Sequence, residues 1–182
     1  LLFRWNMKHT LDMPPSRISD LERLWRLENP IQLGEDQLVE LAMAMVAAGR
    51  LDEAERLYYQ ALVINPDNVS VLRDLVCLMQ GDPSRRKETE ALYRRILVLD
   101  PDNTNALWNL AYMLRDKPSG REEAILLFQR FLEHDLDNVN ALIFLAALLV
   151  QNQSYDNVVE RVYRRLLVED TNNVYTLDTL TR

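Results

Sequence analysis

Residues 35–68 read EDQLVELAMAMVAAGRLDEAERLYYQALVINPDN, and this stretch decides the fold. Apolar residues in its first part lie three and four positions apart, which is the pattern of one buried helix face; they are Leu38, Leu41, Ala42 and Met45. Gly49 interrupts the pattern, and a second stripe follows at Ala54, Leu57, Tyr58, Ala61 and Leu62. Pro66 cannot continue a helix. The stretch therefore predicts two antiparallel helices joined by a short turn.

The pattern recurs along the chain at a constant interval. The stretch ends with NPDN at 65–68, and the related segments DPDN, DLDN and DTNN occupy 100–103, 135–138 and 170–173. The last residues of these segments are 35 positions apart, and each segment follows one apolar stripe and precedes another. A two-helix unit cannot bury its apolar face alone, so we expect the units to stack on one another.

This pattern resembles the tetratricopeptide repeat (TPR) family, whose 34-residue unit carries apolar and small residues at fixed positions of two helices and a closing proline. The units are 35–68, 69–103, 104–138 and 139–173. In the first unit the matching positions are Leu38, Leu41, Ala42, Met45, Ala54, Tyr58, Ala61 and Pro66. In the second unit they are Leu72, Leu75, Val76, Met79, Tyr93, Ile96 and Pro101. In the third unit they are Leu107, Leu110, Ala111, Leu114, Ala124, Phe128 and Phe131. In the fourth unit they are Leu142, Leu145, Ala146, Leu149, Tyr163 and Leu166.

The resemblance implies an all-α fold, a right-handed superhelix of four helix-turn-helix repeats (35–173) with flanking helices. We expect ten helices and no sheet. Three units carry one extra residue, which we place in the turn between their helices. Thr89 and Val159 replace the usual alanine of the second helix, and Leu136 and Thr171 replace the closing proline.

The flanks are less regular than the repeats. We interpret 1–18 as an N-terminal arm and linker. A capping box, Ser19-Asp20-Leu21-Glu22, predicts a capping helix within 19–34. Residues 174–182 fit either a C-terminal capping helix or a truncated repeat, because end repeats need a cover over their apolar face.

Composition excludes several classes of function. The chain of 182 residues has a net charge of −7, which disfavours nucleic-acid binding. The single cysteine, Cys77, excludes an internal disulfide and a multi-cysteine zinc site. His9 and His134 leave little material for acid–base catalysis, and no glycine-rich phosphate loop is present. We therefore expect no enzyme activity, no catalytic residue, no cofactor and no metal.

Two kinds of polar cluster have competing interpretations. The DPDN and DLDN segments superficially resemble calcium loops, but they lack the glycine and glutamate of an EF-hand, so we interpret them as helix caps and turns. The basic clusters at 85–87, 94–95 and 164–165 fit either a solvated outer face or a site for an acidic partner. The overall acidity favours the solvated face.

The resemblance places a partner-binding groove on the first helices of the units. The groove residues are the fifth and ninth residues of each unit, together with Arg115 near one end of the groove. They are Val39, Met43, Arg73, Cys77, Trp108, Tyr112, Arg115, Ile143 and Ala147. Val39 and Met43 stand where one TPR subclass carries a Lys and Asn clamp for a C-terminal carboxylate, so we expect no such clamp. The predicted groove is apolar and aromatic, and we expect Trp108 and Tyr112 to face it rather than the core.

We predict a non-enzymatic interaction module that binds a peptide or an amphipathic helix of a partner protein in this groove. The alternative is an assembly protein that self-associates or forms the soluble part of a membrane-anchored complex. A segment of the same chain could also cover the groove. We expect a cytoplasmic location, either free or tethered to a membrane by an anchor upstream of Leu1, because the apolar run at 141–150 is too short to span a bilayer.

The N-terminal arm generates the first test. Apolar residues alternate with polar ones over 1–13, and the arm to Arg17 carries a net charge of +2. The arm fits either the remnant of a membrane anchor or a strap that docks in a TPR groove, of its own chain or of a second copy in a homo-oligomer. We expect deletion of residues 1–13 to change the mass measured by light scattering, or to make the groove more accessible to peptides. If neither changes, the docking hypothesis is wrong.

Overall fold

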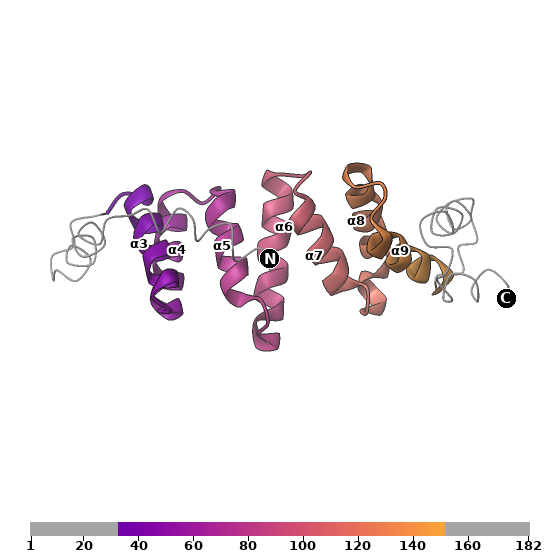
Figure 1. Cartoon of the computed structure of the whole chain (residues 1–182), viewed down its shortest axis with the longest axis horizontal. Helices are drawn as coiled ribbons and strands as arrows, with labels where there is room; N and C mark the ends of the chain where they lie inside the picture. The colour runs from indigo at the N-terminus through magenta and orange to yellow at the C-terminus, as the bar shows by residue number, and fades with distance from the viewer. Residues whose placement is uncertain (1–32, 152–182) are drawn as a thin grey trace. The chain divides into compact units, whose positions relative to one another are not determined.

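The computed structural model describes residues 33–151 of the chain. Within this range it contains seven α-helices, two short 3-10 helices and no strand. The α-helices are α3 (Glu35–Ala47), α4 (Leu51–Ile64), α5 (Val69–Met79), α6 (Arg86–Leu99), α7 (Thr104–Leu114), α8 (Arg121–His134) and α9 (Val139–Gln151) (Figure 1). The 3-10 helices are η1 (Pro83–Arg85) and η2 (Pro118–Gly120). The prediction of an all-α helical-repeat fold is confirmed.

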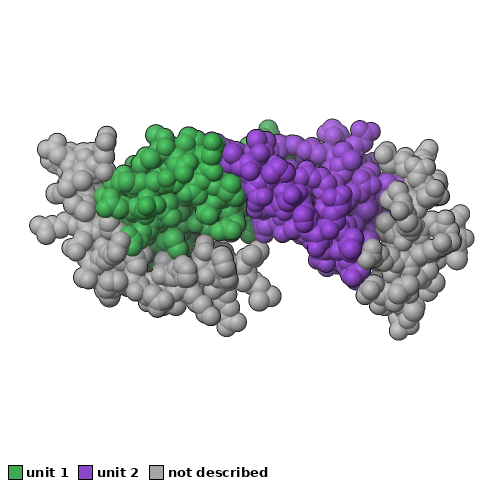
Figure 2. Space-filling view, turned by 90° about the horizontal axis from the view of Figure 1, so that it is seen from above, with its two compact units in different colours: residues 1–92 green, residues 93–182 purple. Residues whose placement is uncertain are grey.

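The chain divides into two compact units, with the boundary within α6 between Leu92 and Tyr93 (Figure 2). Unit 1 is residues 1–92 and unit 2 is residues 93–182. The right-handed superhelical sense concerns the arrangement of the whole chain and stays a prediction.

The core of unit 1 lies where α4 packs against both α3 and α5. Ala42, Ala54 and Ala61 are fully buried in it, so the helix backbones approach closely at these small residues. Larger side chains fill the space on either side; they include Leu41, Met45, Leu57, Leu75 and Met79. Thr89, which replaces the usual alanine in α6, is also buried, and its hydroxyl donates a hydrogen bond to the Arg85 carbonyl at 3.1 Å.

Unit 2 repeats the arrangement with larger side chains. In it α8 packs against both α7 and α9. Ala106, Ala111 and Ala124 are fully buried. Phe128 and Phe131 of α8 occupy positions equivalent to Tyr58 and Ala61 of α4, so this core contains one more aromatic ring at the second position.

Asparagine side chains begin the first helices of three units. The Oδ1 atoms of Asn68, Asn103 and Asn138 accept hydrogen bonds from the backbone N–H groups of residues 71, 106 and 141, at 3.1, 3.0 and 3.0 Å. These bonds satisfy amides that the helix itself leaves unpaired. The side-chain amides of Asn103 and Asn138 in turn donate to Asp100 and Asp135. The cap interpretation of these segments is therefore confirmed.

The extra residue of the second and third units lies in the turn between their helices, as predicted. The turn from α3 to α4 spans residues 48–50, whereas the turns into α6 and α8 span 80–85 and 115–120 and contain η1 and η2. The first helix is shorter by two residues in these units. Gly49 and Gly81 have φ angles of 74° and 96°, a left-handed conformation that side chains with a Cβ disfavour.

The basic clusters on the second helices are paired within the protein. Arg85 is half-buried and donates two bonds of 2.6 Å to Glu55 and further bonds to Glu88. The hydroxyl of Tyr59 and the guanidinium of Arg85 hold the pKa of Glu88 below its usual range. Arg94 donates two bonds to Glu123. The sequence predicted a solvated face but not these ion pairs: Arg94 remains exposed, and Arg85 is half-buried.

Several predicted features lie outside the described residues. They are the arm and linker at 1–18, the capping helix of 19–34 apart from its last two residues, the second helix of the fourth unit, the cluster at 164–165 and the segment 174–182. In the described part of the chain, no helix is long and apolar enough to cross a membrane.

Gly120 generates a test of the turn geometry. Its backbone has φ −102° and ψ −6°, which any residue can adopt, but an added Cβ would lie 2.9 Å from the Leu114 carbonyl oxygen. We expect Gly120→Ala to lower the free energy of unfolding by about 1–3 kcal/mol, because backbone must move to relieve the clash. Urea denaturation measures the change. The matched control, Ser119→Ala, alters an exposed neighbour and should leave stability nearly unchanged; equal stability of both variants would contradict the steric argument.

Candidate functional site

The candidate binding residues lie on the first helices of their units or directly after them, and all nine keep some exposure. Val39 and Met43 are on α3, Arg73 and Cys77 on α5, Trp108 and Tyr112 on α7, with Arg115 directly after it, and Ile143 and Ala147 on α9. Tyr112 and Ala147 are exposed, and the other seven are half-buried.

The packing of the alanine-containing face explains this exposure. On α3 the core takes Leu38, Leu41, Ala42 and Met45, and on α7 it takes the equivalent residues Leu107, Leu110, Ala111 and Leu114. With one face committed to the core, the fifth and ninth positions of a unit lie at the edge of that face. The same helix phase therefore places all four pairs of candidate residues.

The first-helix face of unit 1 is apolar with one cation. Val39, Met43 and Val46 pack partly against the core and leave the rest of their side chains exposed. Arg73 lies one turn before Cys77 on α5. Burial, together with the carboxylate of Asp74, raises the pKa of the Cys77 thiol despite the opposing charge of Arg73. The thiol is therefore protonated at neutral pH and is not an activated nucleophile.

A polar pair is buried next to this face. Asp74 is buried, and the buried Tyr58 hydroxyl donates a hydrogen bond to its carboxylate. Burial and the negative charge of Asp74 raise the pKa of Tyr58, so the tyrosine stays neutral. The hydrogen bond joins α4 to α5 and satisfies the polar groups of both side chains, which is the structural role of a buried polar pair.

Five aromatic rings form the dominant feature of unit 2, and we call them the aromatic cluster: Trp108, Tyr112, Phe128, Phe131 and Phe144. The centre of the Trp108 ring lies 5.2–5.9 Å from the ring centres of the three phenylalanines. The Tyr112 ring lies edge-on to Phe144 at 5.7 Å. Such edge-on and tilted pairs each contribute about 0.5–1.5 kcal/mol beyond their burial, so the cluster holds its exposed members in place.

Trp108 belongs partly to the core, which corrects the expectation that it only faces a groove. Phe128 is fully buried and Phe131 nearly so, and both rings contact Trp108. Tyr112 is different: it contacts the half-buried Phe144, and 45% of its surface is exposed. The two residues lie one turn apart, but only Tyr112 presents most of a ring edge to solvent.

Arg115 completes the face of unit 2. Its guanidinium carbon lies 3.7 Å from the centre of the Tyr112 ring and 4.3 Å from that of Phe144. A stacked guanidinium keeps a fixed orientation and retains its charge. The helices on either side of this arginine, α7 and α9, contain no charged residue.

Phe144 is a member of the candidate site that the sequence interpretation missed. It occupies the sixth position of its unit, one residue beyond the predicted groove position Ile143, and it contacts Trp108, Tyr112 and Arg115. The available signal was an aromatic side chain in an otherwise aliphatic helix, NALIFLAALL.

Between residues 33 and 151, no group of three His, Cys, Asp or Glu side chains is placed to hold a metal ion. His134 ends α8, with its Nε2 atom 3.6 Å from Asp102 Oδ1, and it has no nucleophile among its described contacts.

Comparison with known proteins agrees with this architecture. A family model described as a tetratricopeptide repeat matches residues 35–76. The chain is similar to the solved structure of YrrB, described as a TPR protein with an unusual peptide-binding site (TM-score 0.59, 16% identity, covering 92% of this chain and 87% of that one). It is also similar to MamA AMB-1 (TM-score 0.66, 20% identity, 97% and 94% covered). MamA from Desulfovibrio magneticus RS-1 gives a TM-score of 0.57 at 13% identity, with 87% and 89% covered.

At these identities the likeness to solved structures establishes the fold alone. No curated protein sequence matches the chain significantly. The fold and the family match together define an α-helical repeat protein, and this fold supports a role as a protein-interaction module. Residues 35–76 match the tetratricopeptide repeat model, and the described helices have the architecture of the solved TPR structures.

The different positions of Trp108 and Tyr112 generate a stability test. We expect Trp108→Ala to lower the free energy of unfolding by about 3 kcal/mol, the low end for deleting a large buried ring. Tyr112→Ala should cost about 1 kcal/mol or less, because it removes one edge contact and one cation contact. Thermal and urea unfolding measure both changes. A Tyr112 variant that loses as much stability as the Trp108 variant would show that Tyr112 is also a core residue.

Proposed function

We propose that the chain is a non-enzymatic interaction module whose first-helix face in unit 2 binds an apolar segment of a partner protein. The face consists of Tyr112, Arg115, Ile143, Phe144 and Ala147, with Trp108 beneath it. The partner segment is an extended peptide or an amphipathic helix. The observation that carries the proposal is the exposed Tyr112 ring, held by Phe144 in a cluster whose other rings are buried or half-buried.

The composition of this face favours binding. Tyr, Trp and Arg are the residue types that most often dominate binding free energy. Tyr112 and Arg115 are held by mutual stacking, so they lose little conformational freedom when a partner arrives. Ala147 is exposed one turn beyond Ile143 on α9 and leaves room for a partner side chain.

Unit 1 offers a second, weaker face. Val39, Met43 and Cys77 are half-buried and apolar, and Arg73 supplies a cation. No ring is present among these residues, so unit 1 lacks the aromatic anchor that unit 2 has. YrrB, whose structure is described as having an unusual peptide-binding site, provides a precedent for peptide recognition on this fold.

Self-association is the second candidate function. It is favoured by two isolated apolar side chains at equivalent positions of α4 and α6: Val63 is 82% exposed and Val98 is 79% exposed. Both lie on second helices, away from the candidate face. Light scattering over a concentration series distinguishes this function, because self-association raises the mass with concentration.

A capture experiment tests the proposed face. We expect Tyr112→Ala and Ala147→Glu each to weaken binding of a captured partner by roughly 30-fold, which corresponds to about 2 kcal/mol. The first removes the exposed ring, and the second places bulk and charge on the apolar surface. Affinity capture with wild-type and variant chains, read by mass spectrometry, identifies partners whose binding depends on the face.

The matched control is Leu126→Ala, which removes an exposed apolar side chain from α8. A partner of the proposed face should bind this variant as it binds the wild type. Partners that are lost equally from all three variants, or from none of them, would contradict the assignment of the site.

A further inference from the structure

Among the described residues, Arg115 has more hydrogen-bond donors than neighbouring acceptors. Within the described part of the chain its side chain makes one contact with an acceptor, from Nε to Oδ1 of Asp116 at 3.4 Å. Asp116 is 71% exposed, so this contact is weak and solvent-screened. The Nη1 atom of Arg115 is buried and has no hydrogen-bond partner. A buried donor without an acceptor is unfavourable by about 1–3 kcal/mol.

Stacking determines where a new acceptor can approach. The five N–H groups of a guanidinium lie in its plane, and aromatic rings contact its faces. Tyr112 and Phe144 hold the plane of Arg115, and 22% of its side chain stays exposed, so an acceptor can approach part of its edge although Nη1 itself is buried. A carboxylate is the protein group that matches this edge, because its two oxygens can accept two parallel N–H bonds.

The charge distribution permits an acidic segment at this face. The chain carries a net charge of −7, which disfavours acidic partners in general. However, α7 and α9 contain no Asp or Glu, and Arg115 supplies the positive charge between them. In unit 2, the carboxylate of Glu123 on α8 already accepts two hydrogen bonds from Arg94. A carboxylate near Tyr112 therefore meets one stacked cation and two uncharged helices, with the exposed Asp116 beside the arginine as a nearby like charge.

We propose, resting on the function proposed above, that the partner segment carries an acidic side chain flanked by apolar residues. Its carboxylate accepts hydrogen bonds from Arg115, while an apolar neighbour lies against Tyr112 and another against Ile143 and Ala147. The acid belongs to a side chain within the segment rather than to a chain terminus. A single arginine set in an apolar surface accommodates a segment that continues on both sides of the acid.

Selection from random peptides tests this chemistry before any natural partner is identified. Twelve-residue peptides displayed on phage are selected on the full chain, and the enriched sequences are synthesised with acetylated and amidated ends, which removes terminal charges. We expect the enriched peptides to share an Asp or Glu beside an apolar residue. Replacing that acid by Asn or Gln should weaken binding at least ten-fold, measured by fluorescence anisotropy.

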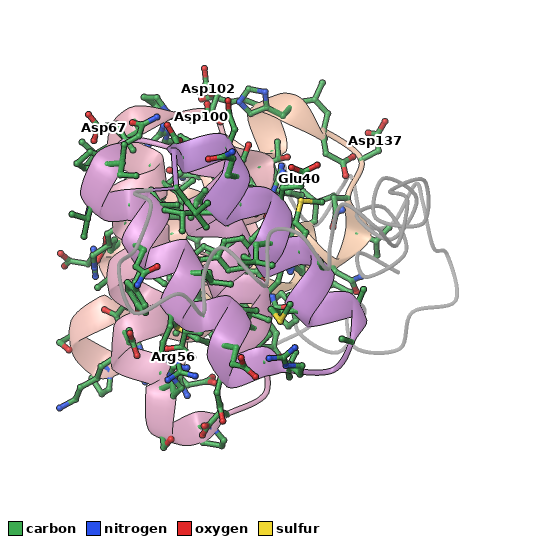
Figure 3. The ribbon with its side chains drawn as sticks, turned by 90° about the vertical axis from the view of Figure 1, so that its left-hand side faces the viewer. Glu40, Arg56, Asp67, Asp100, Asp102 and Asp137 are labelled. Carbon is green, nitrogen blue, oxygen red and sulfur yellow. The ribbon has the colours of Figure 1, made fainter. Side chains whose placement is uncertain are left out.

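A double-mutant cycle assigns the effect to Arg115. Arg115→Gln should weaken the acidic peptide about as much as the change in the peptide does, and the peptide change should then have little further effect on this variant. Arg115→Lys keeps the charge but loses the planar edge of the guanidinium. Its affinity for the acidic peptide should therefore lie between that of the wild type and that of Arg115→Gln. Arg56→Gln is the matched control, because it removes an exposed arginine from α4 and should leave binding unchanged (Figure 3).

The outcomes separate the two proposals. Enriched peptides without an acid that still require Tyr112 would overturn the carboxylate inference and support the binding face. An acid whose replacement weakens wild type and Arg115→Gln equally would also overturn the inference. If no peptide is enriched, or if binding ignores both Arg115→Gln and Tyr112→Ala, the inference and the proposed function both fail. The effect of the peptide substitution is measured with the wild-type chain, so this measurement tests the inference even if an Arg115 variant does not fold.

Discussion

Close approach of helices at small residues is the constraint on which the rest of the structure depends. Ala42, Ala54 and Ala61 are fully buried in unit 1, and Ala106, Ala111 and Ala124 are fully buried in unit 2. A larger residue at such a position must be accommodated by displacement of a packed neighbour. Each alanine therefore fixes not only the separation of two helices but also their rotation. That rotation in turn determines which side chains of the first helices remain exposed.

The same packing carries different chemistry in different repeats. In the third repeat Trp108 contacts Phe131, and the equivalent residues of the first repeat are Val39 and Ala61. Both members of the pair are large in one repeat and small in the other. The helix boundaries of the second helices are nevertheless the same, since α4 and α8 both have 14 residues. Binding character is thus set by a few positions, and a repeat acquires an aromatic surface without altering its architecture.

The sequence predicts the helices well because their causes are local. Asn68, Asn103 and Asn138 begin the first helices of three units, and the 35-residue interval between them sets the repeat. The extra residue of the later units falls in the turns for a related reason. Inside a helix, an added residue would rotate all the following side chains away from the buried face. Gly120 could not be predicted as a steric requirement, since its neighbour Leu114 approaches only after the turn has folded.

The candidate site was harder to predict because its contacts join separate helices. The spacing of first-helix residues predicted which side chains keep some exposure, but not that Phe144 would lie between Trp108 and Tyr112. Nor did it show that Trp108 contributes to the core. The pairing of Arg85 with Glu55 and of Arg94 with Glu123 was also missed, although a signal was present: opposite charges recur 29 or 30 residues apart on neighbouring second helices.

These ion pairs explain why the arginine that follows α7 is distinctive. Exposed salt bridges contribute little to stability, but bidentate pairs specify the geometry of the groups that they join. The second helices therefore place much of their charge in contacts within the protein, as at Arg85 and Arg94. Arg115 instead lies against the rings of Tyr112 on α7 and Phe144 on α9. These rings orient its guanidinium, while Nη1 has no hydrogen-bond acceptor among the described residues. This difference from Arg85 and Arg94 is the reason for which we propose that a partner carboxylate pairs with Arg115.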